Sequence, residues 1–72
     1  MKKIIKKKAY DTEKATIVGR KTFGAWGDVD GYEEILYKTL KGDYFVYGIG
    51  GEESAYPQEA IVPITEDEAK EF

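Results

Sequence analysis

The sequence contains no cysteine and no histidine. Without cysteine, no disulfide can cross-link the chain and no thiolate can hold a metal ion. Without histidine, there is no imidazole to act as a general base, and Ser54, the only serine, has no histidine to activate it. We therefore expect a protein that is not an enzyme and that binds no metal ion or cofactor.

Long apolar segments are also missing, because the longest unbroken runs span two to three residues. A membrane-spanning helix needs about 20 apolar residues, and the charged residues 1–8 are not followed by the apolar core of a secretory signal. We expect one cytoplasmic domain that covers residues 1–72 and makes no membrane contact. A domain this small buries only about 60 % of its unfolded surface, so it needs its aromatic residues as core, or self-association as a homodimer.

Two short motifs resemble ligand loops but lack the residues that such loops need. Residues 28–31 (DVDG) have neither the glycine nor the glutamate spacing of an EF-hand, so we interpret them as a turn. Residues 48–51 (GIGG) lack the G-x-G-x-x-G spacing, and the two glutamates that follow would repel a phosphate. We expect structural glycines here, which let the chain bend or let Trp26 or Tyr56 pack on bare backbone.

Charge is distributed unevenly along the chain. Residues 1–21 hold eight Lys or Arg against two Asp or Glu, whereas residues 43–72 hold one against eight. The chain therefore has a basic beginning and an acidic end. Two interpretations remain open: the two ends lie close together and attract each other, or they form two faces with different partners.

The pattern of apolar residues predicts short strands. Lysine-rich residues 3–10 are typical of an edge strand, and residues 15–23 predict a second strand. Residues 33–40 and 43–49 alternate with period two around Lys41-Gly42, which predicts a β-hairpin with a turn of two residues or of three residues with a bulge. Residues 61–64 predict a short strand that Pro63 confines to a sheet edge.

The C-terminal residues predict a short helix. Thr65 and Glu68 have the spacing of a capping box, so we expect a helix over residues 66–72 that docks through Ala69 and Phe72. The predicted fold class is α+β, mainly β: an antiparallel sheet of four or five strands with this helix on one face. Trp26 is expected as a lid on one end of the core. The predicted core residues are Ile17, Phe23, Ile35, Tyr37, Phe45, Tyr47, Ile49, Ile61, Val62, Ile64 and Phe72.

Two sets of charged residues are candidate binding sites. The basic set, a candidate nucleic-acid-binding strand, consists of Lys2, Lys3, Lys6, Lys7, Lys8, Lys14, Arg20 and Lys21, with Tyr10 and exposed members of Tyr32, Tyr37, Tyr44 and Tyr47 for base stacking. The acidic set, a candidate protein-binding face, consists of Glu52, Glu53, Glu59, Glu66, Asp67, Glu68 and Glu71. The alternative for each set is a solvated, solubilising surface.

Five segments in their order and spacing carry a resemblance to known sequences. They are YDTE at 10–13, EILYKT at 34–39, GDYFVYGIGG at 42–51, SAY at 54–56 and IVPITEDEA at 61–69. Together they resemble a group of small proteins, without a settled activity, from phages and conjugative elements of Gram-positive bacteria (Firmicutes). The resemblance implies an accessory protein of a mobile element in a bacterial cytoplasm, and it assigns no functional residues.

Three functional hypotheses follow. The first is a non-enzymatic binding module that acts by contact with an unidentified protein partner, in its most specific form by inhibiting a host nucleic-acid-handling or defence enzyme. The second is a single-stranded nucleic-acid-binding protein that uses the lysine-rich strand. The third is a structural homo-oligomer that pairs through edge strands.

Overall fold

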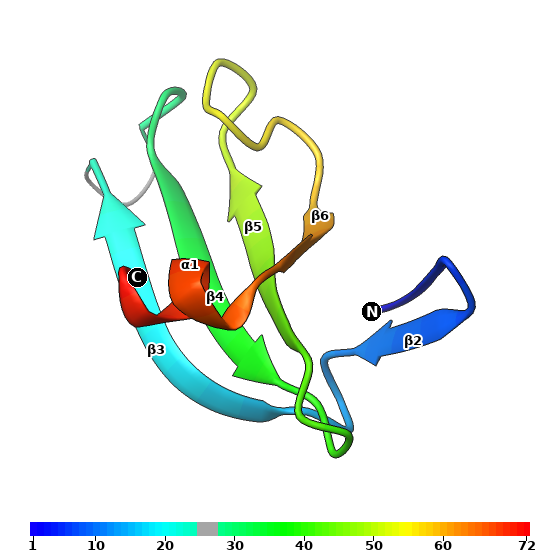
Figure 1. Cartoon of the computed structure of the whole chain (residues 1–72). Coiled ribbons are helices and arrows are strands. Elements are labelled where there is room, and N and C mark those ends of the chain that lie inside the picture. The colour runs from blue at the N-terminus through cyan, green and yellow to red at the C-terminus, as the bar shows by residue number, and fades with distance from the viewer. Residues whose placement is uncertain (25–27) are drawn as a thin grey trace.

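The computed structural model describes residues 1–24 and 28–72. Within them the chain forms six strands and one short helix (Figure 1): β1 (Lys2–Ile5), β2 (Lys8–Asp11), β3 (Thr16–Phe23), β4 (Tyr32–Lys38), β5 (Tyr44–Gly50), β6 (Ala60–Ile64) and α1 (Glu66–Lys70). Strands β3, β4, β5 and β6 form an antiparallel sheet in that order, and β1 and β2 form a separate hairpin. The predicted mainly β, antiparallel fold with a C-terminal helix is confirmed. The predicted lid residue, Trp26, lies outside the described residues.

The β4–β5 hairpin follows the period-two pattern of its sequence. Ile35 lies opposite Tyr47, and Tyr37 lies opposite Phe45, so all four side chains share one face of the sheet. The adjacent strand β6 extends this face, because Ile61 lies opposite Tyr47. The hairpin prediction is therefore confirmed, together with the face that its alternation assigned to the core.

The turn of this hairpin contains three residues between Thr39 and Asp43. The N–H of Thr39 donates to the carbonyl of Asp43 at 2.7 Å, and the N–H of Gly42 donates to the carbonyl of Thr39 at 3.0 Å. Gly42 has φ 90°, which glycine adopts without the steric cost that a side chain brings. Of the two turns that the sequence allowed, the structure has the three-residue turn with a bulge.

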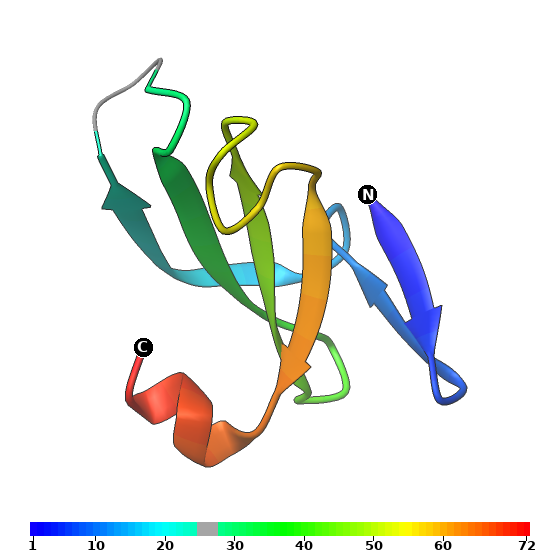
Figure 2. The same cartoon turned by 90° about the horizontal axis from the view of Figure 1, so that it is seen from above.

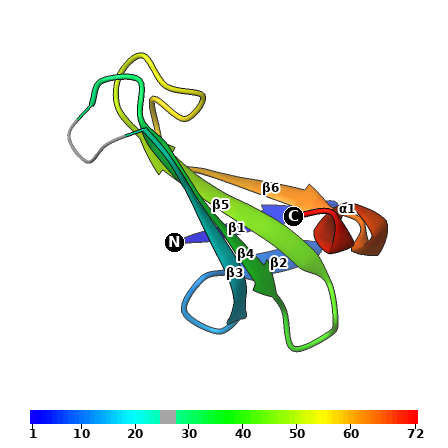
Figure 3. The same cartoon turned by 90° about the vertical axis from the view of Figure 1, so that its left-hand side faces the viewer.

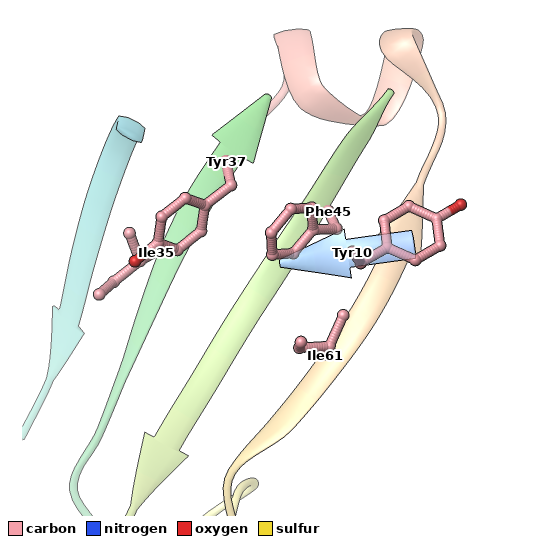
Figure 4. Packing of buried hydrophobic residues seen from close by; sticks show 5 residues of the cluster. All are labelled: Tyr10, Ile35, Tyr37, Phe45 and Ile61. Atoms are coloured by element: carbon pink, nitrogen blue, oxygen red, sulfur yellow. The ribbon is translucent and has the colours of Figure 1, made fainter. Parts of the chain in front are cut away.

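The main core lies on the sheet face that the β1–β2 hairpin covers. It consists of Tyr10, Ile35, Tyr37, Phe45 and Ile61, all buried (Figure 4). Tyr37 stacks on Phe45 with 5.0 Å between ring centroids, and Tyr10 of β2 meets the same ring edge to face at 5.5 Å. Tyr10 is therefore the aromatic anchor that fixes the hairpin to the sheet.

The opposite face carries a second, smaller buried layer of Leu36 and Val46. Figure 1 views this face, with α1 in front of the sheet, and the C-terminal Phe72 lies against Gly19 of β3. Both faces are thus partly covered, each by a short element. This arrangement explains the corrections to the predicted core: Ile17, Phe23, Ile49 and Val62 are exposed, whereas the buried residues Tyr10, Leu36 and Val46 were not predicted.

The lysine-rich segment differs from its prediction as one edge strand. It forms the two strands β1 and β2, with Lys2 opposite Asp11 and Ile5 opposite Lys8. The turn between them places Lys6 and Lys7 at φ 50° and 68°. Positive φ at both central residues is the geometry of a tight hairpin turn that normally carries Asn or Gly. Because lysine gives no such signal, the turn was not recognisable in the sequence.

The predicted helix cap is confirmed, but the helix is shorter than expected. The Thr65 hydroxyl accepts from the N–H of Glu68 at 3.2 Å, and the Glu68 carboxylate accepts from the N–H of Thr65 at 3.1 Å. The helix ends at Lys70 instead of residue 72, which leaves Phe72 half-buried beyond it. Pro63 lies in β6, the outer strand of the sheet, as its missing N–H predicts.

Candidate functional site

The basic set of residues does not lie on one strand. Lys6 and Lys7 form the tip of the β1–β2 hairpin, which projects beside the sheet in Figure 2. Arg20 and Lys21 lie on β3, and as neighbours in a strand they point to opposite faces. Arg20 pairs with Glu33 at 3.7 Å. The structure thus divides the predicted basic strand into a hairpin group and a β3 group.

The tyrosines do not form a platform on which bases could stack. Tyr10 is only 6 % exposed, and Tyr37 is also buried, so the fold leaves neither ring open for base stacking. Its ring is needed to fill the core beside Phe45. Tyr32 stacks on Phe23 with 4.5 Å between ring centroids, and the half-buried Tyr44 has the Lys38 ammonium 5.6 Å from its ring centroid.

Two further tyrosines are bound to carboxylates. The hydroxyl of Tyr47 donates to Glu59, and the hydroxyl of Tyr56 donates to Glu34, each at 2.5 Å. The bond to Glu59 raises the pKa of Tyr47 to about 12, and burial together with the bond to Glu34 raises the pKa of Tyr56 to about 12. A neutral hydroxyl that donates to a carboxylate loses this bond when it ionises, so both groups stabilise the fold in their neutral form.

The acidic set does not form one face either. Glu52 and Glu53 lie in the loop that follows β5, whereas Glu66, Asp67 and Glu71 lie on or beside α1. Figure 3 shows this loop and α1 at opposite ends of β6. Strand β6 has five residues and spans about 17 Å at roughly 3.3 Å per residue, so the two groups are separated by about that length. The sequence predicted one acidic surface because these residues are close along the chain, but β6 lies between the two groups and separates them.

Strand β3 offers a surface that the sequence did not single out. It is an outer strand of the sheet, paired only with β4, and Ile17 and Val18 are 53 % and 54 % exposed. Ile17 lies opposite Tyr37 of β4, and Gly19 lies opposite the adjacent Leu36. Val18, between them, has no partner of its own and is the extra residue of a β-bulge. The sequence predicted a strand here with Ile17 in the core, and only the strand order of the fold identifies it as an edge strand.

One face of β3 is in contact with Phe72 at the C-terminal end of the chain. The ammonium of Lys21 lies 4.5 Å from the ring centroid of Phe72, and the ring lies against Gly19. A cation over an aromatic ring at this distance is a favourable contact. The C-terminus therefore fixes one side chain of β3 while the outer side of the strand stays open.

The two motifs that resemble ligand loops have structural places in the fold: residues 28–31 form the predicted turn, and residues 48–50 belong to β5. The N–H of Gly31 donates to the carbonyl of Asp28 at 3.2 Å, and the ring of Tyr56 lies on the backbone of Gly48. This confirms the prediction of structural glycines in the second loop. Across residues 1–24 and 28–72, no group of three or more Asp or Glu side chains is arranged to hold a metal ion, and no helix has the length and apolarity to span a membrane.

Comparisons with known proteins add no relative. No protein-family model matches the chain, and neither curated protein sequences nor solved structures give a significant match. The resemblance to small proteins of phages and conjugative elements therefore stays a prediction, and the function must be argued from the geometry.

Proposed function

We propose that this protein is a small binding module that acts by protein–protein contact, and that its contact surface is the outer edge of β3. One observation carries the proposal: an eight-residue strand lies at the edge of the sheet with Ile17 and Val18 more than half exposed. The N–H and C=O groups on the outer side of an edge strand are available to another chain. Strand addition to such an edge is a common mode of peptide recognition.

The opposite edge of the sheet supports this choice by contrast. Strand β6 has five residues, and one of them is Pro63, which has no N–H to donate. A strand added there would meet a shorter and interrupted row of hydrogen-bonding groups. The edge of β3 is therefore the better site for an incoming strand.

The charges of β3 define the kind of partner. Arg20 and Lys21 present one cation on each face, and the bulge at Val18 leaves residues 19–23 as the regular part of the edge. An antiparallel second copy centred on Lys21 would place the two Lys21 side chains directly opposite each other, and like charges in this position are unfavourable. The surface therefore fits an extended acidic segment of another protein, with an apolar residue beside Ile17 or Val18.

We further propose the bacterial cytoplasm as the setting and a host nucleic-acid-handling or defence enzyme as the partner class. The resemblance to proteins of mobile elements supports both parts of this proposal. The acidic residues support it less than the sequence predicted, because they form two separate groups instead of one array that could imitate a phosphate backbone.

A display selection of short peptides on the immobilised protein, followed by calorimetry, tests the proposal. We expect the selected peptides to alternate acidic and apolar residues and to protect the amides of β3 from hydrogen exchange. Val18→Lys and Arg20→Glu should each weaken binding about tenfold, because they remove an apolar contact and reverse a charge at the contact. Leu40→Lys is the matched control, since it makes the same kind of change on a leucine that lies in the β4–β5 turn.

Two results would contradict the proposal. One is equal binding of the peptides to the wild type and Val18→Lys, and the other is protection of β6 instead of β3. Light scattering at increasing concentration adds a separate check. If the mass of the wild type doubles from 8.1 kDa while Val18→Lys stays at 8.1 kDa, the partner of this edge is a second copy of the chain.

A second candidate, nucleic-acid binding, is favoured by the projection of the β1–β2 hairpin. Five lysines lie on its strands and turn: Lys2, Lys3, Lys6, Lys7 and Lys8. Without a tyrosine platform, binding would rest on phosphate contacts and fall steeply with salt. Fluorescence anisotropy with labelled oligonucleotides at about 50 mM salt tests it. Replacing Lys6-Lys7 by Asn-Gly removes two charges and keeps the turn. If this change leaves the affinity for the oligonucleotide unaltered, the hairpin tip is not part of the nucleic-acid-binding surface.

A further inference from the structure

A cavity of about 280 Å³ lies where the β1–β2 hairpin meets the turn between β4 and β5. Its walls come from the hairpin, from residues 11–15 and from residues 39–43. This volume is close to the lower limit of about 300 Å³ for pockets that bind small molecules. The three wall segments are distant in the sequence, and only the docking of the hairpin brings them together.

Positive charge surrounds the cavity. Four lysines line it, Lys2, Lys8, Lys14 and Lys41, against the two carboxylates of Asp11 and Asp43. The Lys8 ammonium pairs with Asp43 at 3.1 Å, and Asp11 accepts from the N–H of Glu13 at 2.9 Å. Among the ion pairs of residues 1–24 and 28–72, none involves the other three lysines. The lining therefore has a surplus of two positive charges and three ammonium groups without an ionic partner.

The backbone that carries these lysines is well held. The N–H of Thr12 donates to the carbonyl of Met1 at 3.0 Å, and the N-terminal ammonium donates to the Thr12 hydroxyl at 2.8 Å. The N–H groups of Lys14 and Ala15 both donate to the carbonyl of Asp11, at 3.2 and 3.0 Å. The lysine side chains thus extend from a closed turn and a paired strand, which fixes where their stems begin.

The cavity also has an apolar part. Ala9, Ala15 and Leu40 contribute to its lining, and Leu40 is 88 % exposed. A leucine this exposed gains by contact with an apolar group. The combination of free ammonium groups and apolar wall suits a ligand that carries a compact anion on a flat apolar body, because lysine binds phosphate as a point charge.

We propose that this cavity binds a small organic phosphate, with Lys2, Lys14 and Lys41 around the phosphate and Leu40 against the apolar body. The binding is independent of the β3 edge, because no residue of β3 lines the cavity. It requires the β1–β2 hairpin to be docked, because the hairpin and the turn after it supply Lys2 and Lys14.

Adenosine monophosphate is the probe for an NMR titration at low salt, with adenosine and inorganic phosphate as the two half-ligands. We expect saturable shifts at Leu40 and Ala15 and tighter binding of the nucleotide than of either half. Lys14→Glu and Lys41→Glu should each weaken binding about tenfold, the loss expected for one charge-assisted contact. Lys6→Glu makes the same charge change at the tip of the β1–β2 hairpin, outside the cavity, and less than a twofold effect is expected of it.

Three outcomes would overturn the inference. Linear shifts without saturation would show that there is no site. Equal weakening by Lys6→Glu and Lys14→Glu would mean that the whole hairpin attracts anions, as expected of a nucleic-acid-binding surface. If inorganic phosphate and the nucleotide bind with equal affinity, and if Leu40→Ala leaves the affinity for the nucleotide unchanged, the site has no apolar part that contributes to binding.

Discussion

Gly48 lies in the middle of β5 beneath the ring of Tyr56, and exchanging it for alanine tests how this side of the sheet is built. A Cβ on Gly48 would lie 2.5 Å from Cζ of Tyr56 and closer still to two other ring carbons, whereas 3.4 Å is an ordinary contact. The ring would therefore have to leave its place. Its hydroxyl would then lose the bond to Glu34, and the ring would lose its edge contact with Tyr32 at 5.6 Å.

The magnitude follows from these losses. A hydrogen bond to a charged group contributes about 1.5–3 kcal/mol, and an aromatic edge contact contributes about 0.5–1.5 kcal/mol. In the other direction, alanine is better than glycine in a strand by about 0.5–1 kcal/mol. We therefore expect Gly48→Ala to lower the free energy of unfolding by about 2 kcal/mol. In a Tyr56→Ala background the obstructing ring is absent, so the same change should be neutral or stabilise by about 0.5 kcal/mol.

Urea denaturation followed by circular dichroism measures the four free energies of this double-mutant cycle. Gly19→Ala is the matched control, because a Cβ there would meet the ring of Phe72 at an ordinary 3.4 Å, and it should not destabilise the fold. Equal destabilisation by Gly48→Ala in both backgrounds would refute the reasoning. So would a loss from Gly19→Ala as large as that from Gly48→Ala, since alanine in the sheet would then be unfavourable for a general reason.

Three further changes have expected outcomes. Tyr10→Ala removes the anchor of the β1–β2 hairpin and should cost about 3–5 kcal/mol, whereas Tyr10→Phe should cost little because the hydroxyl points away from the cluster in Figure 4; urea denaturation compares the two. Replacing Lys6-Lys7 by Asn-Gly should raise stability by about 1 kcal/mol, measured as a shift of the urea midpoint, because both positions have positive φ. The pKa values of Tyr47 and Tyr56, raised to about 12 from 10, predict that their stabilisation is complete below pH 10 and is lost as the pH rises towards 12. In the double variant with Phe at both positions, the free energy of unfolding measured by urea denaturation should fall less between pH 10 and pH 12 than in the wild type.

The β4–β5 hairpin and the helix cap were predictable because their signals are local. Alternation over residues 33–49 needs only neighbours along the chain, and Thr65 and Glu68 interact within one helical turn. Gly42 marked the turn, since its positive φ is a property of the residue type. The three-residue form of that turn depends on the bond between Thr39 and Asp43, which the sequence alone did not distinguish from a shorter turn.

What the sequence could not provide are contacts between segments that are far apart. Tyr10 was interpreted as a surface residue because it follows a run of lysines, yet its ring completes the core through Phe45, 35 residues later. Leu36 was missing from the predicted core because alternation identifies two faces without saying that both are covered. Ile17 was placed in the core for its apolarity, and its exposure follows from the position of β3 at the edge.

The pairing of tyrosines with carboxylates also decides which surfaces are left for binding. Tyr47 and Tyr56 direct their hydroxyls to Glu59 and Glu34, and Tyr10 and Tyr37 are buried, so most of the tyrosine surface serves the fold itself. Two surfaces remain available for binding: the edge of β3, with its aliphatic side chains and two cations, and the small cavity lined by lysines. The first depends on the four-stranded sheet and the second on a hairpin that Tyr10 and the Lys8–Asp43 pair attach to it. Because the two surfaces depend on different contacts, a loss of hairpin docking should abolish phosphate binding while peptide binding at β3 persists.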